Sequence, residues 1–192
     1  MRNILCFEGE WKFNNHRRKN RFNHNSAPIL KLLKEFYNSN YAYRHIITQE
    51  DLEHYFKFFN RNISELKKFE VIYFSCHGWH HSISLGSENG NLDLDALAEI
   101  SGNFFRDKIV HFSCCKTMAN HNAVLNFKEK TGAKLVTGYT KSVDIMDSSI
   151  ADTAILKELI TSNKLGNIKN EDVSLFRKKY KSLLDTLGFE AM

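Results

Sequence analysis

The chain has 192 residues, 42% of them hydrophobic and 26% charged, which is the size and balance of one globular domain able to bury a sizeable core. A single proline, Pro28, and the lack of any Ser/Gly-rich or low-complexity stretch leave no place for an interdomain linker, so we expect one domain over residues 1–192. The net charge of +5 is too modest to identify a nucleic acid or another acidic partner.

The first part of the chain alternates between strand-like and helix-like segments. Residues 3–7 form an apolar run that ends at Glu8 and Gly9, as a buried strand does before a turn. After a polar and basic stretch over residues 16–24, Ser26 and Pro28 predict a helix that runs to about residue 37. Its apolar side chains recur at three- and four-residue steps and should pack on a sheet; they are Ile29, Leu32, Leu33 and Phe36.

The same alternation continues along the chain. Residues 41–47 are aromatic and β-branched, as in a strand, and Thr48 with Asp51 predicts a capping box at the start of the next helix. Further strands are expected over residues 69–78, 108–114 and 133–139, and further helices over residues 92–100, 118–131, 148–161 and 172–187. Strands that alternate with helices predict right-handed βαβ crossovers, and hence an α/β fold with a mostly parallel sheet covered by helices on both faces.

Two of these strands end in residues that can do chemistry. The strand VIYFS runs into Cys76, His77 and Gly78, and the strand KIVHFS runs into Cys114 and Cys115. If the two strands are adjacent and parallel, their carboxyl ends bring the histidine and a thiol within reach of one another. A histidine can take the proton of a thiol, and the thiolate then attacks an acyl carbon. The backbone amides of Gly78 and Cys115 are natural donors to the oxyanion, and a glycine at position 78 would let a substrate approach the backbone closely.

The sequence around these residues resembles the CHAT-domain and caspase-like cysteine peptidases of clan CD over roughly residues 70–160. FSCHG followed by ISL is similar to their histidine motif, and NLDLDALAEI followed by KIVHFSCCKT is similar to their helix and cysteine strand. Their Ser-Ala-Cys-x-Thr pattern aligns its cysteine with Cys115, and Cys114 takes the place of the usual alanine. The opening CFEGEW resembles small stand-alone bacterial members without an assigned function.

The resemblance implies a three-layer caspase-like (caspase–haemoglobinase) fold and a cysteine endopeptidase with a His77–Cys115 dyad, which needs no metal or organic cofactor. The caspase-type Gln-Ala-Cys-x-Gly is absent, and His77 and Cys115 are closer in sequence than the caspase separation of about 50 residues, which fits the compact CHAT arrangement better. Asp144 matches the Val-Asp loop of the CHAT pattern, where it would line a pocket for a basic residue at the cleavage position.

Two further carboxylates belong to the candidate site. Glu8 and Glu10 follow the first strand, which in this type of sheet neighbours the histidine strand. One of them can orient His77 or contact substrate, and both can equally be solvated loop residues.

Other interpretations stay open. The same fold can serve as an interaction or sensor module with an idle dyad. A zinc site is a weaker alternative, because the histidines and cysteines over residues 76–81 and 111–115 lack Cys-x-x-Cys spacing and strand alternation scatters them. The basic segments at residues 17–21 and 176–181 are typical of solvated faces and accompany no recognised nucleic-acid motif, so nucleic acid binding is not expected.

Compartment and partners are predicted from the same features. The apolar start is broken by Glu8 and Glu10, too early for a signal peptide, and no apolar run is long enough to span a bilayer, so we expect a cytoplasmic protein without membrane contact. Four cysteines in such a chain are expected to be free thiols. The expected partner is a protein or peptide substrate; an activating partner, and a homodimer formed through a sheet edge as in caspase relatives, both stay open.

Overall fold

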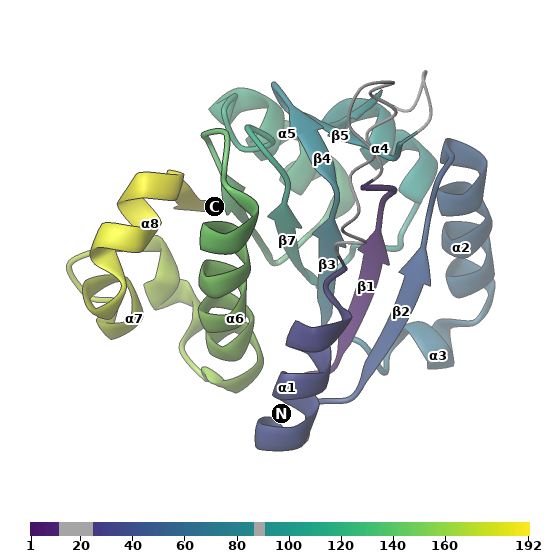
Figure 1. The fold of residues 1–192 in the computed structure, drawn as a ribbon. Helices are drawn as coiled ribbons and strands as arrows, with labels where there is room; N and C mark the ends of the chain where they lie inside the picture. Colours follow the sequence, from purple (N-terminus) through teal and green to yellow (C-terminus); the bar gives the residue numbers. More distant parts are fainter. Residues whose placement is uncertain (12–24, 87–90) are drawn as a thin grey trace, which may run out of the picture.

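The computed structural model describes residues 1–11, 25–86 and 91–192, and its centre is a six-stranded sheet (Figure 1). The strand order is β2-β1-β3-β7-β8-β9, in which the first five strands are parallel and β9 is antiparallel to β8. The strands are β1 (Ile4–Glu8), β2 (Tyr41–His45), β3 (Val71–Ser75), β7 (Ile109–Ser113), β8 (Leu135–Tyr139) and β9 (Phe189–Ala191).

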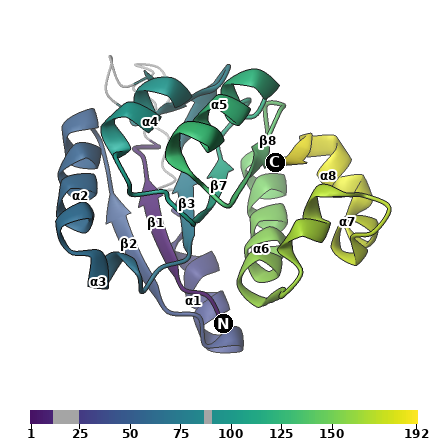
Figure 2. The ribbon, with the colours of Figure 1, turned by 180° about the vertical axis from the view of Figure 1, so that it is seen from behind.

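Helices cover both faces of this sheet, so the molecule has three layers. One face carries α1 (Ala27–Tyr37) and α6 (Ile145–Thr161), with α7 (Leu175–Lys179) and α8 (Lys181–Leu187) beside α6 (Figure 1). The other face carries α2 (Gln49–Arg61), α3 (Ile63–Leu66), α4 (Leu94–Ser101) and α5 (His121–Thr131), as Figure 2 shows from behind. A short 3-10 helix, η1 (Leu165–Lys169), follows α6. The expected α/β class, with a mostly parallel sheet between two helical layers, is confirmed.

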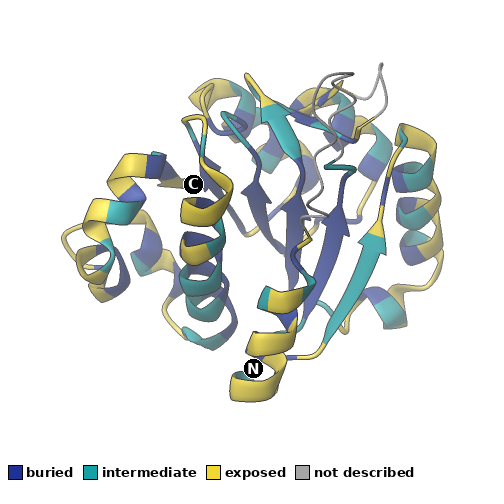
Figure 3. Cartoon of the chain, viewed as in Figure 1, coloured by how far each residue is buried: buried dark blue, intermediate teal, exposed yellow. Residues whose placement is uncertain are grey.

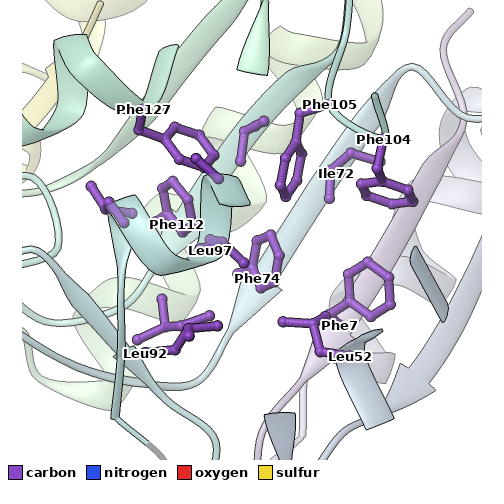
Figure 4. Packing of buried hydrophobic residues seen from close by; sticks show 14 of the residues in the cluster. Phe7, Leu52, Ile72, Phe74, Leu92, Leu97, Phe104, Phe105, Phe112 and Phe127 are labelled. Carbon is purple, nitrogen blue, oxygen red and sulfur yellow. The ribbon is translucent and has the colours of Figure 1, made fainter. Parts of the chain in front are cut away.

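The two faces of the sheet bury different cores, and the central strands are buried along their whole length (Figure 3). Under α2, α4 and α5 the core is rich in phenylalanine: Phe74 of β3 stacks between Phe7 and Phe112 of the neighbouring strands, with ring centroids 5.4 and 5.3 Å away (Figure 4). Under α1 and α6 the core is mainly aliphatic. Burial of apolar area on both faces, at about 25 cal/mol per Å², is the main stabilising term of such a fold.

Thr48 and Asp51 form the predicted capping box at the start of α2. The backbone N–H of Asp51 donates to Thr48 Oγ1 at 3.2 Å, and the backbone N–H of Thr48 donates to Asp51 Oδ2 at 3.0 Å.

The structure corrects the predicted face of α1. Leu30 and Leu33 are the buried residues of this helix, whereas Leu32 and Phe36 are 43% and 73% exposed. The segment contains two apolar rows, one starting at Ile29 and one at Leu30, and a helix can turn only one row toward a sheet. The prediction from periodicity is therefore right for Leu33, which is buried, and for Ile29, which packs partly buried against the same core, and it is wrong for Leu32 and Phe36.

Two further differences lie in short elements. The helix expected over residues 172–187 is divided at Tyr180 into α7 and α8, and β9 follows it. From His77 onward the chain forms a small antiparallel sheet of β4 (His77–Trp79), β5 (Ser82–Ser84) and β6 (Asn91–Asp93). This sheet takes residues from the predicted strand over 69–78 and from the predicted helix over 92–100. Three-residue strands are too short to give a recognisable alternation.

None of the helices in the described part of the chain is both long enough and apolar enough to cross a bilayer.

Candidate active site

His77 and Cys115 follow the carboxyl ends of two adjacent strands. β3 and β7 pair in parallel with Ser75 opposite Ser113, and each of the two site residues lies two positions beyond its serine. Both side chains are half-buried and line one cavity of about 240 Å³. The strand adjacency expected from the sequence is therefore present, and both residues line the same cavity at one edge of the sheet.

Backbone contacts hold Cys115 in place. Its Sγ lies 3.4 Å from the backbone N of Val143, which donates to it, so the loop before α6 forms one wall of the thiol site. Lys116, the next residue, has a positive φ of 56°, and its backbone N–H donates to the carbonyl of Lys141 at 3.0 Å. A non-glycine residue in the left-handed region costs about 1–2 kcal/mol, and such strain is typical of functional sites.

The hairpin that carries His77 packs against the loop that carries Cys115. The backbone N–H of His81 donates to the carbonyl of Lys116 at 3.2 Å, and Thr117 Oγ1 donates to the carbonyl of Ser82 at 3.1 Å. At Gly78 a Cβ atom would lie 2.5 Å from the Cys115 carbonyl oxygen. Gly78 is thus required by contact within the chain, a different reason from the substrate approach expected from the sequence.

Cys76 and Cys114 belong to the phenylalanine-rich core, and Cys76, unlike Cys114, also lines the cavity. Each is 1% exposed, and their Sγ atoms are 3.1 Å apart. Burial, followed by the hydrogen bond with Cys76, raises the pKa of Cys114 well above its usual range, so this thiol stays protonated. Strand alternation predicts this opposite orientation of Cys114 and Cys115, and Cys115 is the more accessible thiol of the two.

Glu8 contacts the site through an aromatic neighbour. Its carboxylate is 1% exposed and accepts hydrogen bonds from Trp11 Nε1 at 2.8 Å and from Ser26 Oγ at 2.7 Å. The Trp11 indole in turn packs edge-on against the His77 imidazole, with centroids 4.7 Å apart. Glu8 therefore supports the indole that contacts His77. The alternative interpretation of Glu8 as a solvated loop residue is wrong, because its carboxylate is buried and hydrogen-bonded.

Glu10 and Asp144 lie outside the lining of this cavity. The backbone N–H of Glu10 donates to the Leu85 carbonyl at 3.2 Å, next to the small sheet. Asp144 is the exposed N-cap of α6, and its Oδ1 accepts the backbone N–H groups of Met146 and Asp147 at 2.8 and 3.2 Å. The acidic side chain that lines the cavity is instead Asp152, about two turns further along α6.

Asp152 is the centre of a buried hydrogen-bond network at the base of the cavity. It is 2% exposed, and each of its two oxygens accepts two bonds. The donors to Oδ2 are Tyr73 at 2.8 Å and Ser113 at 2.5 Å; those at Oδ1 are Tyr139 at 2.5 Å and His111 Nε2 at 3.0 Å. Nδ1 of His111 contacts Thr137 Oγ1 at 2.9 Å. The four polar partners come from three neighbouring strands and converge on one helix.

The two tyrosines of this network are held in their protonated form. Burial, and then the negative charge of Asp152, raises the pKa of both Tyr73 and Tyr139 well above the ordinary value for a phenol. Each phenol is thus a permanent donor to the carboxylate. The arrangement satisfies a buried carboxylate that would otherwise be costly to remove from water.

Comparison with known proteins identifies the family of this chain. A model described as a family of unknown function (DUF6642) matches residues 1–191. The chain belongs to this family. No curated protein matches the sequence. Among solved structures, an NADH:FMN oxidoreductase in its apo form is similar at 12% identity with a TM-score of 0.46, over 85% of this chain and 92% of that chain.

In this DUF6642 member, the Asp152 network is the part of the site that the sequence did not reveal. The signals available were a histidine and two tyrosines inside otherwise apolar strands, and an aspartate among the apolar residues of a helix, IADTAIL. Each polar residue in a buried segment needs a partner, but the sequence does not say which.

The structure also bears on the two alternative interpretations, a zinc site and a nucleic-acid-binding surface. In the described ranges, no three or more His, Cys, Asp or Glu side chains cluster closely enough to hold a metal ion. The basic segment at residues 17–21 lies outside the described residues. Within the other basic segment, Arg177 is buried and pairs with Glu171 at 2.8 Å, so this residue serves the packing of α7.

Proposed function

We propose that this protein is a caspase-like, CHAT-related cysteine endopeptidase that cleaves peptide bonds with a His77–Cys115 dyad. The observation that carries the proposal is that both side chains line one cavity at the carboxyl ends of adjacent parallel strands. The caspase-like fold is supported by the mostly parallel sheet between two helical layers, and by the location of the histidine and the cysteine after neighbouring strands.

The proposed reaction needs no group beyond the chain and a water molecule. His77 takes the proton of the Cys115 thiol, and the thiolate attacks the substrate carbonyl carbon to form a C–S bond. The backbone amides of Gly78 and Cys115 donate to the oxyanion as it develops. The C–N bond then breaks while His77 returns the proton to the leaving amine, and a water molecule activated by His77 hydrolyses the thioester.

The cavity favours a basic substrate side chain beside the scissile bond. Asp152 supplies its negative charge, and Ser113 directs its hydroxyl proton at Asp152, which leaves the serine lone pairs for a donor from the substrate. A lysine or arginine side chain matches both the charge and the acceptor groups. We assign this selectivity to Asp152 in place of Asp144, because Asp152 lines the cavity and Asp144 does not.

Labelling with an acyloxymethyl-ketone peptide probe that carries lysine or arginine tests the dyad. The wild type should be labelled at Cys115, and Cys115→Ala and His77→Ala should lose labelling. Cys114→Ala is the matched control, since it introduces the alanine of the CHAT pattern and removes a buried core thiol. Equal labelling of the wild type, Cys115→Ala and His77→Ala would overturn the dyad assignment. A peptide-library preference for acidic residues would overturn the basic selectivity.

The alternative function is a catalytically idle interaction or sensor module of the same fold. It is favoured by the exposed apolar residues of α1 and α6, which the peptidase chemistry does not use. The discriminating experiment is complementation of a deletion phenotype: an idle module keeps its function in the Cys115→Ala variant, and a peptidase loses it.

A further inference from the structure

A second cavity lies outside the candidate active site, between α1, α6 and the α7–α8 region. It measures about 470 Å³, and we call it the α1–α6 groove. Its apolar lining includes Leu32 and Phe36 of α1 and Ile150 and Ala154 of α6. Figure 3 shows that the outward sides of both helices are exposed. Leu32 and Phe36, which the sequence predicts on the packing face of α1, thus line this groove instead.

Three large apolar side chains that line the groove are exposed to solvent. Phe36 is 73% exposed, Ile150 53% and Leu32 43%. Single exposed apolar residues are ordinary, but several that line one hollow indicate an interaction surface. Leu32 and Phe36 are four residues apart, as are Ile150 and Ala154, so each helix presents an i,i+4 apolar row along the groove. Two such rows side by side accept a third helix, ridge into groove.

The charge of the groove selects its partner. The charged side chains in its lining are Lys157 and Lys179, and no acidic residue is among the lining residues. Lys157 has only a distant contact with Glu158, at 3.8 Å, and the Lys179 ammonium lies over the Tyr180 ring at 5.2 Å. A second copy of this chain related by a two-fold axis would bring lysines against lysines, which repel. Charge complementarity instead favours an acidic segment.

We propose that the α1–α6 groove binds an amphipathic helix of a partner protein that carries acidic residues beside its apolar face. Helix α6 links this surface to the candidate active site, since Ser148, Ser149 and Asp152 line the active-site cavity while Ile150, Ala154 and Lys157 line the groove. A partner bound in the groove on one side of α6 would therefore lie close to the dyad on the other side. Binding itself does not depend on the dyad, so the proposal can be tested in the Cys115→Ala protein.

The test measures binding of fluorescent amphipathic peptides by anisotropy. A panel of 18-residue helical peptides carries leucine and phenylalanine at i, i+3, i+4 and i+7 steps with glutamate beside this row, in several helical phases. A matched panel has lysine in place of glutamate. We expect saturable binding of acidic members, weakened by salt, and about tenfold or more weaker binding of the lysine versions.

Variants locate the binding surface. Phe36→Glu and Ile150→Glu should each weaken acidic-peptide binding about tenfold or more. Phe58→Glu is the matched control, because Phe58 is 45% exposed on α2 and lies away from the groove, and it should bind as the wild type does. Lys157→Glu should reverse the preference toward the lysine peptides. Circular dichroism and Tm measurements verify that the surface variants fold.

Several results would overturn the proposal. They are no saturable binding by any acidic peptide, equal loss in Phe36→Glu and Phe58→Glu, or equal affinity for acidic and basic peptides. A dimer in sedimentation equilibrium that Phe36→Glu dissociates would identify a second copy as the occupant. Binding of phosphatidylserine vesicles or of a DNA oligonucleotide, lost in Phe36→Glu, without peptide binding would assign the surface to a membrane or to nucleic acid.

Discussion

The buried carboxylate of Asp152 is stabilised by the hydrogen-bond donors around it. The carboxylate accepts four hydrogen bonds, and each comes from a residue that is itself buried. Hydrogen bonds to charged groups are stronger than neutral ones, and a fully satisfied network makes a core rigid. The network therefore fixes both the base of the cavity and the strand end that leads to Cys115.

Replacing Asp152 with asparagine should be far more costly than the same change at Asp144. In Asp152→Asn an amide N–H₂ faces two hydroxyl or imidazole donors, and we expect the free energy of unfolding to fall by about 2–4 kcal/mol. Asp144→Asn keeps a good N-cap and should change the stability by less than about 0.5 kcal/mol. Urea denaturation of both variants measures the difference. Equal losses in the two variants would contradict the hub role of Asp152.

Residues of the site differ in how far the sequence reveals them. His77 and Cys115 are predictable because each directly follows an apolar strand, and parallel strands end at one edge. The Asp152 network is not predictable in the same way, because its donors lie 13 to 79 positions from Asp152 along the chain and reach it only after the strands and α6 are assembled. The capping role of Asp144 is not evident from the sequence, because its match to the Val-Asp position of the CHAT pattern predicts a pocket residue.

At the scale of elements, the contact between the β4–β5 hairpin and the Cys115 loop makes Gly78 irreplaceable. In Gly78→Ala the new Cβ would lie 2.5 Å from the Cys115 carbonyl oxygen and 2.8 Å from the Cβ of Cys114, and both neighbours are difficult to move. We expect a loss of about 2 kcal/mol or more of stability, typical of overpacking, and loss of probe labelling at Cys115.

Gly166→Ala provides the control for this substitution. A Cβ atom at position 166 would meet nothing within 4 Å, so the variant should be as stable as the wild type or slightly more stable. Differential scanning fluorimetry and probe labelling of the two variants test the contact. Normal labelling of Gly78→Ala would show that the hairpin does not constrain the loop.

The cap of α2 gives this element a pH dependence. Hydrogen bonds from the backbone of Ile47, and further ones from Thr48, lower the pKa of Asp51 below its ordinary value of 3.8. Because the folded-state pKa is the lower one, the stabilisation is present above pH 3.8 and is lost as the pH falls through the folded-state pKa.

Asp51→Ala should therefore cost about 1 kcal/mol of stability at neutral pH, and the difference from the wild type should shrink below about pH 4. Glu50→Ala, in the same helical turn but without a capping bond, is the control. Denaturant titrations at several pH values provide the measurement. A difference that stays constant down to pH 2 would exclude the ionised carboxylate as its cause.

Elements with strong local signals could be predicted, and short ones could not. The five parallel strands and the helices between them follow from long apolar runs and from capping residues such as Thr48. The strands β4, β5, β6 and β9 have only three residues each, so tertiary contacts define them. The buried face of α1 is difficult to predict for another reason. The helix has two apolar rows, and the packing of α1 on the sheet determines which row is buried.

At the scale of the whole molecule, β9 protects the edge of the sheet. It pairs with β8 from Phe189 to Ala191, and Met192 exchanges backbone hydrogen bonds with Val136. A deletion of residues 189–192 removes a buried phenylalanine and leaves the β8 edge unpaired. We expect a loss of about 4 kcal/mol, a decrease in Tm of about 10 °C, and concentration-dependent aggregation.

Glu190→Ala is the matched control for this deletion, since the Glu190 side chain is exposed and its strand pairing remains. Thermal unfolding and light scattering at several protein concentrations measure the two effects. A deletion variant as stable and as soluble as the Glu190→Ala variant would mean that β9 does not protect the edge.

Both tryptophans of the chain lie beside the candidate dyad. Trp11 packs against the His77 ring, and Trp79 lies under the Lys116 ammonium, at 4.5 Å from ring centre to nitrogen. The tryptophan fluorescence of the protein therefore reports on this site, because one indole contacts His77 and the other contacts Lys116, the residue after the thiol. Protonation of His77 or occupation of the cavity should change the emission without any attached dye, so site titration and ligand binding can be followed in the unlabelled protein.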